Sequence, residues 1–451
     1  MISFPPPRTL ETTRDAAAWP RYLPSMTDYD SPATFRGQLH RGRGIAVQRA
    51  TTEPDAAEAV YECVFEDMRW DLPCDERDSY LAGLIHRLQL PLGPIERRLA
   101  TAEDSESVEH TLGILALLPF VGRADAAALL ERYAVEGRYR QLALEAIGCS
   151  GVFKLPRLWD GLADAVAAAY DDDQLGEAIS YYRGDPWPRL AESQPRIRRL
   201  LDEVTAARKA KLQPGPGVEY REQQQSAEAS LEALIQDVAT GGQKRAHALS
   251  ELGRRGEHRV IDLAEEICWD DPSARIPGMA KALDYLGPTA VPRARVWSAS
   301  DNRTLAHLAT RVLAEHGDSS DTGTLHAALK DYIARGEWCT AETPARGLGR
   351  LGARDAANDL MAAWENTPHS LARVTFLQAL IGCCAPWAEA CAKEGLLDCQ
   401  PEVRQLACEE APDSAGVRQR LREIARDPLF PQVHEAAHSR LRLLAEPRLT
   451  S

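Results

Sequence analysis

Apolar residues recur at helical spacing in residues 352–382, which read GARDAANDLMAAWENTPHSLARVTFLQALIG. A first group at positions i, i+3, i+4 and i+7 comprises Ala357, Leu360, Met361 and Trp364. This spacing places the four side chains on one face of an α-helix. Pro368 then ends the helix, because proline has no backbone N–H and disfavours the helical conformation of the residue before it.

A second helix is predicted directly after this proline. Its inward positions are Val374, Leu377, Leu380 and Ile381. Gly382 follows, at a place where glycine readily adopts the left-handed conformation that caps a helix. Neither short helix can bury its apolar face alone, so we expect the pair to stack against neighbouring pairs.

The helix pair is repeated along the chain. The pattern G-x-x-D-A-A-x-x-L occurs at 122–130 and 352–360, and each copy precedes a helix that ends in Ile-Gly-Cys, at 147–149 and 381–383. Glycines at predicted helix ends are Gly253, Gly287, Gly317, Gly352 and Gly382, and successive subtraction gives intervals of 34, 30, 35 and 30 residues. Such intervals are typical of helix-pair arrays. We therefore predict an all-α chain that forms an α-solenoid of stacked antiparallel helix pairs.

Proline, glycine and polar runs divide the chain into four predicted segments. They are an irregular arm at 1–50 with a short helix near Asp15–Trp19, an N-terminal helical region at 51–212, a linker at 213–225, and a C-terminal helix-pair array at 226–446. The linker is predicted from proline and glycine alternating beside a polar run, QPGPGVEYREQQQS. We expect the last helix, 432–444, to act as the terminal cap of the array.

The composition narrows the classes of function. The net charge of −14 argues against a general nucleic-acid binder, because such a protein needs a clustered excess of Lys and Arg. The start of the chain has no signal-peptide pattern, and no apolar run is long enough to cross a bilayer. We therefore expect a cytoplasmic protein with no membrane partner. The ten cysteines are expected to be reduced and mostly buried, since those at 383, 384, 391, 399 and 408 show no C-x-x-C spacing.

Three stretches resemble the second helix of HEAT repeats, in which an arginine near the helix start precedes small and apolar residues. They are QKRAHALSELG at 243–253, SLARVTFLQALIG at 370–382 and PEVRQLACEEA at 401–411. LGRLGARDAANDL at 348–360 is similar to the short HEAT variety of phycobilisome-lyase-type proteins. The resemblance covers residues 107–150 and 240–445. It implies a HEAT- or armadillo-like superhelix, and we expect a non-enzymatic protein-interaction scaffold with a concave surface, no catalytic residue and no cofactor.

Arginines on the predicted second helices are the candidate binding residues. They are Arg245, Arg254, Arg255, Arg346 and Arg350, with Arg373 and Arg404 at related positions. Free guanidinium groups in a row would recruit an acidic protein partner. The alternative is that these arginines cap neighbouring helices or pair with carboxylates of the next repeat. We favour that alternative for Arg373 and Arg404 and leave it open for the others.

Two further motifs suggest enzymes. His434, Glu435 and His438 form a literal H-E-x-x-H, as in zinc hydrolases, but only thirteen residues follow and the two alanines between the histidines suit helix packing. Trp269-Asp270-Asp271 places an aromatic beside carboxylates, as in HEAT-type alkylpurine DNA glycosylases that hold an extruded nucleotide. A helix-capping role explains that second motif equally well.

Overall fold

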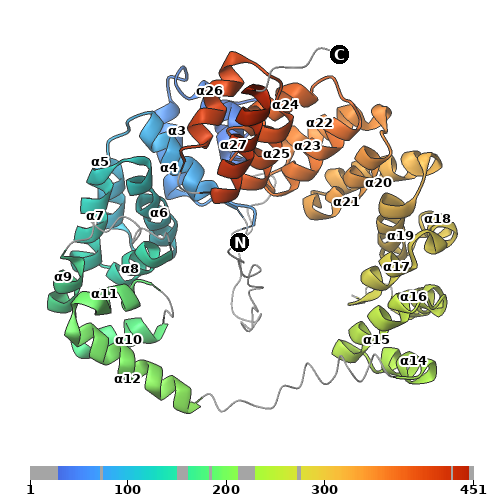
Figure 1. Cartoon of the computed structure of the whole chain (residues 1–451), viewed down its shortest axis with the longest axis horizontal. Coiled ribbons are helices and arrows are strands. Elements are labelled where there is room, and N and C mark those ends of the chain that lie inside the picture. The colour runs from blue at the N-terminus through green and yellow to red at the C-terminus, as the bar shows by residue number, and fades with distance from the viewer. Residues whose placement is uncertain are drawn as a thin grey trace.

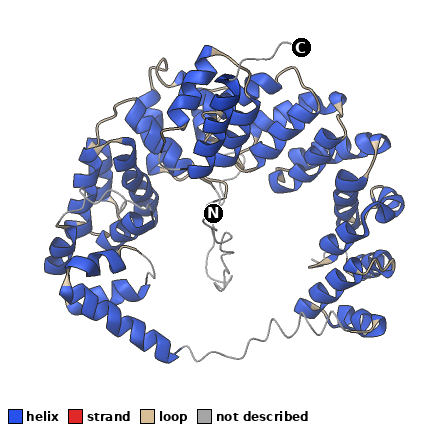
Figure 2. Ribbon diagram, viewed as in Figure 1, coloured by secondary structure: helices blue, strands red, loops and turns tan. Residues whose placement is uncertain are grey.

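The computed structural model describes residues 29–71, 75–149, 161–181, 185–211, 229–271, 276–427 and 430–445. All regular structure in these residues is helical, as Figure 2 shows, and they contain no strand. The predicted all-α class is thus confirmed. The predicted linker at 213–225 and the short helix near Asp15–Trp19 lie outside the described residues.

The N-terminal helices begin inside the segment that the sequence pattern marks as irregular, because residues 35–49 form two short helices. The helices of this half are α1 (Phe35–His40), α2 (Gly44–Arg49), α3 (Ala56–Phe65), α4 (Arg77–Arg87), α5 (Gly93–Thr101), α6 (Glu106–Leu117), α7 (Ala124–Glu136), α8 (Arg140–Cys149), α9 (Leu162–Ala169), α10 (Asp172–Tyr181), α11 (Trp187–Ser193) and α12 (Pro195–Lys211), with the 3-10 helix η2 (Leu118–Val121).

The C-terminal helices are regular pairs. They are α14 (Leu231–Thr240), α15 (Gly242–Arg254), α16 (Arg259–Asp270), α17 (Met279–Leu286), α18 (Val291–Trp297), α19 (Arg303–His316), α20 (Thr322–Ala334), α21 (Trp338–Arg350), α22 (Ala357–Asn366), α23 (Ala372–Gly382), α24 (Ala388–Gly395), α25 (Pro401–Glu410), α26 (Ala415–Ile424) and α27 (Pro431–Ala445), with 3-10 helices η5 (Gly287–Ala290), η6 (Ser319–Asp321) and η7 (Arg354–Ala356). Each even-numbered helix from α14 packs on the next odd-numbered one, and the odd-numbered helices pack on one another in order.

The stretch with the clearest periodicity forms the pair α22 and α23. Leu360, Trp364, Leu377 and Leu380 are buried, and the break at Pro368 lies between the two helices. Both copies of the repeated pattern begin with a glycine of positive φ, 95° at Gly122 and 64° at Gly352. The predicted helix-ending glycines all lie at or within two residues of the ends of α15, α17, α19, α21 and α23.

The left-handed cap predicted at Gly382 is wrong. Gly382 is the last residue of α23, and the positive φ of 50° occurs two residues later, at Cys384. A Cβ at Gly382 would lie 2.4 Å from the carbonyl oxygen of Gly349 on α21. Glycine is therefore needed here for the close approach of two helix backbones, and not for a turn.

The two halves of the chain meet at a junction between residues 29–71 and 75–80 on one side and residues 365–404 on the other, which we call the N–C junction. In Figure 1 the helices follow a curved path that brings the first and last parts of the chain together. The backbone N–H of Cys399 donates to the carbonyl of Gly42 at 2.9 Å, and Arg41 Nε donates to the carbonyl of Asn366 at 3.0 Å. A Cβ at Gly44 would lie 2.0 Å from the carbonyl oxygen of Glu394, so the two backbones touch there.

Buried ion pairs hold the N–C junction. Arg43 forms two hydrogen bonds of 2.9 Å to the Glu394 carboxylate across the junction. Within the C-terminal half, Arg373 forms two bonds of 2.8 Å to Asp398, and both side chains have 0% exposure. Burial alone would lower the pKa of Arg373, but the Asp398 carboxylate holds it above its ordinary value. The guanidinium therefore stays charged and can donate to neighbouring oxygens.

We expect the substitution Arg373→Met to reduce the free energy of unfolding by about 3–5 kcal/mol, because it leaves the Asp398 carboxylate buried without its cation. The double variant Arg373→Met/Asp398→Leu removes both charges and is expected to recover much of this loss. Urea denaturation followed by circular dichroism measures both. A double variant less stable than the single one would contradict the role assigned to the pair.

Candidate functional site

The five candidate arginines all have partners nearby. Arg245 Nε donates to the carbonyl of Val238 at 2.8 Å. Arg254 and Arg255 share the Glu251 carboxylate, with both distances 2.7 Å. Arg346 pairs with Glu315 at 3.1 Å, and Arg350 donates to the carbonyls of Ala314 and Gly317 at 2.8 Å each. The structure thus brings Arg254 and Arg255 to one carboxylate, and Arg346 and Arg350 to neighbouring groups of α19.

The arginines therefore serve mainly as caps and ion-pair partners. Arg350 closes the C-terminal end of α19, and Arg245 does the same for α14. Arg373 pairs with Asp398 of the following repeat, as favoured from the sequence. Arg404 lies 3.8 Å from Asp427 and 4.3 Å from the ring centroid of Phe430. These contacts therefore do not provide a row of free guanidinium groups for an acidic partner.

An exposed aromatic face on α16 is the stronger candidate for a binding surface, and we call it the Trp269 face. An open hollow of about 750 Å³ is lined there by Arg259, Asp262, Glu265, Glu266, Trp269 and Asp270. The Trp269 side chain is 61% exposed, which is unusual for so large an apolar group. Buried Val260, Leu263, Ala264 and Cys268 occupy the opposite side of the helix.

The signal for this exposure is present in the sequence. Nine residues separate Val260 from Trp269, and about nine residues make two and a half helical turns, so the two side chains point in opposite directions. A capping role for Trp269-Asp270-Asp271 depends on the position of the helix end and does not by itself say that Trp269 is exposed. Asp270 ends α16 and Asp271 is its C-cap residue.

The charge of the Trp269 face is negative. Among the described residues that line the hollow, four are carboxylates and one is a cation, Arg259, which already pairs with Asp262 at 3.2 Å and Glu266 at 2.6 Å. Glu265 accepts hydrogen bonds from Arg293 and from Trp297 Nε1 of α18, and the Arg293 bond lowers the pKa of Glu265. A phosphate group would be repelled here, which disfavours the glycosylase interpretation of this motif.

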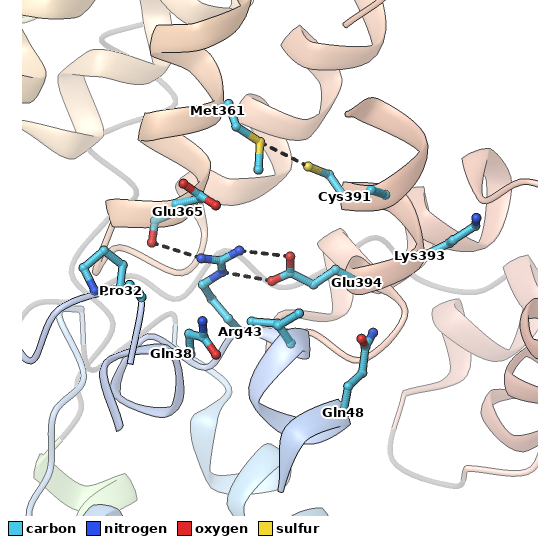
Figure 3. Close-up of a pocket in the computed structure, with 12 residues that line it drawn as sticks. Pro32, Gln38, Arg43, Gln48, Met361, Glu365, Cys391, Lys393 and Glu394 are labelled. Atoms are coloured by element: carbon cyan, nitrogen blue, oxygen red, sulfur yellow. Dashed lines mark hydrogen bonds and ion pairs between the residues drawn. The ribbon is translucent and has the colours of Figure 1, made fainter. Parts of the chain in front are cut away.

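A second hollow, of about 520 Å³, lies at the N–C junction (Figure 3). Its lining joins residues 32–48 to α22 and α24, so it exists only when the junction is formed. Two cations, Arg43 and Lys393, balance two carboxylates, Glu365 and Glu394. Because Arg43 is held by Glu394, the lining has no excess of one charge with which to select a ligand.

The H-E-x-x-H motif lies on α27, where its alanines pack. Ala437 is buried with Val433 in the core formed by the last helices, while His438 is exposed and His434 is half-buried. Among the described residues, no group of three or more His, Cys, Asp or Glu side chains is placed to hold a metal ion. Nor does any described helix have the length and apolarity needed to cross a membrane.

Among the described residues, two histidine–aspartate pairs also resemble the paired groups of catalytic sites. His326 Nε2 lies 2.6 Å from Asp359 Oδ2, between α20 and α22. His110 is 6% exposed, with Nδ1 at 3.1 Å from Asp78 Oδ1 and Nε2 at 3.0 Å from the carbonyl of Cys63. Since both nitrogens of His110 face acceptors, this environment favours the protonated ring. Its burial makes this pair structural.

No protein-family model, no characterised protein and no solved structure matches the chain.

The two arginines at the end of α21 provide a matched test of the capping role. Arg350→Ala is expected to lower the free energy of unfolding by roughly 1 kcal/mol, because it leaves the end carbonyls of α19 without a charged donor. Arg346→Ala removes only an exposed ion pair and is expected to cost about 0.5 kcal/mol or less. Urea denaturation compares them, and equal effects would contradict the difference in role.

His110 predicts a pH-dependent contribution to stability. Burial would lower its pKa, but the hydrogen bond to Asp78 and the charges of Asp78 and Asp67 outweigh this and raise it. A raised pKa stabilises the folded state below the unfolded value, about 6.5, and this contribution is lost as pH rises through the folded pKa. The stability difference between the wild type and His110→Gln should therefore be larger at pH 5.5 than at pH 9. Asp78→Asn should remove most of this pH dependence.

Proposed function

We propose that this protein is a non-enzymatic interaction scaffold built as a HEAT-type α-solenoid. The order of helix contacts from α14 to α27 supports this proposal, because each pair packs on the next and the odd-numbered helices α15 to α27 form one continuous layer. Two further features fit HEAT-like pairs that stack in a fixed way. They are the repeated glycine pattern at 122–130 and 352–360 and the arginine caps.

The Trp269 face is the observation that supports a binding role. Tryptophan is enriched among the residues that dominate the energy of protein interfaces, and here it stands exposed on a helix whose other side is fully packed. On the neighbouring helix α18, which is tied to α16 through Glu265, Val296 is also 61% exposed. An aromatic and an aliphatic side chain with charged neighbours suit a protein partner.

Site-specific photo-crosslinking tests the proposal. A photo-reactive amino acid at position 269, in the full chain expressed in cells of the native host, is expected to capture a protein partner. The control places the same amino acid at position 181, where Tyr181 is 68% exposed on α10 of the other half. The captured partner, once purified, should bind the wild type saturably and bind Trp269→Ala at least roughly tenfold more weakly.

The arginine hypothesis is tested in the same assay. A variant with Arg254, Arg255, Arg346 and Arg350 changed to Glu should still bind the partner, because these side chains already have local acceptors. Loss of binding in this variant, with binding kept in Trp269→Ala, would assign the interface to the arginines instead. A partner that binds every variant equally would refute the scaffold surface proposed here.

A further inference from the structure

The first turns of α16 show how this helix binds guanidinium groups. Arg259 lies between Asp262 and Glu266, and Arg293 reaches from α18 to the Glu265 carboxylate. Carboxylates placed on successive turns thus each hold an arginine of the chain itself. Paired oxygens of this kind match the planar fork of a guanidinium group.

The last turn of the helix repeats this arrangement with an aromatic added. Asp270 follows Glu266 by four residues, so it lies on the same side of the helix, and Trp269 stands beside it. No arginine or lysine of the described residues stacks on the Trp269 ring or pairs with Asp270. The electron-rich face of an exposed indole attracts cations, most often arginine.

Elsewhere in the structure, aromatic rings at the ends of helices already hold guanidinium groups. The Arg140 guanidinium lies 3.9 Å from the centroid of Tyr170, and that of Arg404 lies 4.3 Å from the centroid of Phe430. In both cases the arginine comes from a different helix or repeat than the ring. An arginine from outside would complete the same contact at Trp269.

We propose that the Trp269 face binds a basic, arginine-bearing segment of a partner protein, with one guanidinium stacked on Trp269 and paired with Asp270. This inference rests on the proposed scaffold function and names its partner class. The excess of carboxylates around the hollow favours a basic segment over nucleic acid, whose phosphates it repels. A second copy of this chain is disfavoured by its net charge of −14.

The test uses the full chain and a fluorescent peptide in which four arginines alternate with glycine and serine. Fluorescence polarisation is expected to show saturable binding that weakens by at least about tenfold between 50 and 500 mM NaCl. Trp269→Ala is expected to weaken binding roughly three- to tenfold, since it removes the ring that the guanidinium stacks on. Asp270→Asn should weaken binding and reduce its salt dependence, whereas Tyr181→Ala should change neither.

Control peptides separate the sources of binding. Replacing arginine by lysine should weaken binding, because an ammonium group lacks the planar fork, and replacing it by glutamate should abolish binding. The chain's own Arg275 lies shortly after α16 in the sequence, so the assay is repeated with Arg275→Ala, where equal or tighter binding is expected. Equal binding to wild type and Trp269→Ala, or preference for the glutamate peptide, would overturn the inference.

The two proposals fail in different ways. If crosslinking at position 269 captures a partner whose binding is insensitive to salt and is not displaced by the arginine peptide, the scaffold function stands and the basic-segment inference is wrong. If no captured partner depends on Trp269 or on the four arginines, the proposed function itself is wrong, whatever the peptide does.

Discussion

The N–C junction depends on the burial of several arginines, and each is tolerable only because oxygen atoms surround it. Arg77 shows the balance most clearly: it is held by Asp75 through two hydrogen bonds and also donates to the carbonyl of Pro368. Ser370 donates to the same Asp75 from the other half of the chain. Removing one oxygen partner would leave a buried charge that costs several kcal/mol, on the order of 3–5. The junction is therefore specific in its pairing, because a shifted register would leave these charges unpaired.

Much of the helix arrangement was predictable from local pattern. The apolar spacing of α22 and α23 and the ends of the odd-numbered helices follow from rules that act over one or two turns. Gly382 shows where these rules stop, since its reason lies in the backbone of Gly349 on another helix. A glycine needed for a turn and a glycine needed for close packing look the same in sequence.

The N–C junction could not have been predicted from the same rules. Arg41 and Arg43 stand in the run RGQLHRGRG, which has the composition of an exposed loop, yet both are buried. Both have acceptors more than three hundred residues away, with Arg41 and Asn366 separated by 325 positions, and Arg41 also donates to the nearby carbonyls of Asp30 and Gly37. Periodicity describes which face of a helix is apolar, but it does not say which charged residue another segment will cover.

The two candidate surfaces differ in what their charged groups do. The arginines of the odd-numbered helices donate to carbonyls at the ends of neighbouring helices or pair with carboxylates. The chain therefore has many arginines on these helices because they fix how the pairs stack. The Trp269 face has local ion pairs as well, but its last turn leaves an aromatic and a carboxylate directed outward. The two candidate surfaces thus differ in whether their side chains are available to a partner. That depends on the fold and not on how often a residue type occurs in the sequence.

The long separation of the junction partners also affects how the chain is made. Residues 29–50 leave the ribosome early, but their distant acceptors at the end of α22 and on α24 appear only after about three hundred further residues have been added. At roughly 5–20 residues per second, this delay lasts on the order of tens of seconds. During that time the Arg43 side chain lacks its Glu394 partner and must remain hydrated while α3 to α12 fold behind it. Closure of the junction is therefore a late step of synthesis, and it joins two halves whose cores are largely separate clusters of buried residues.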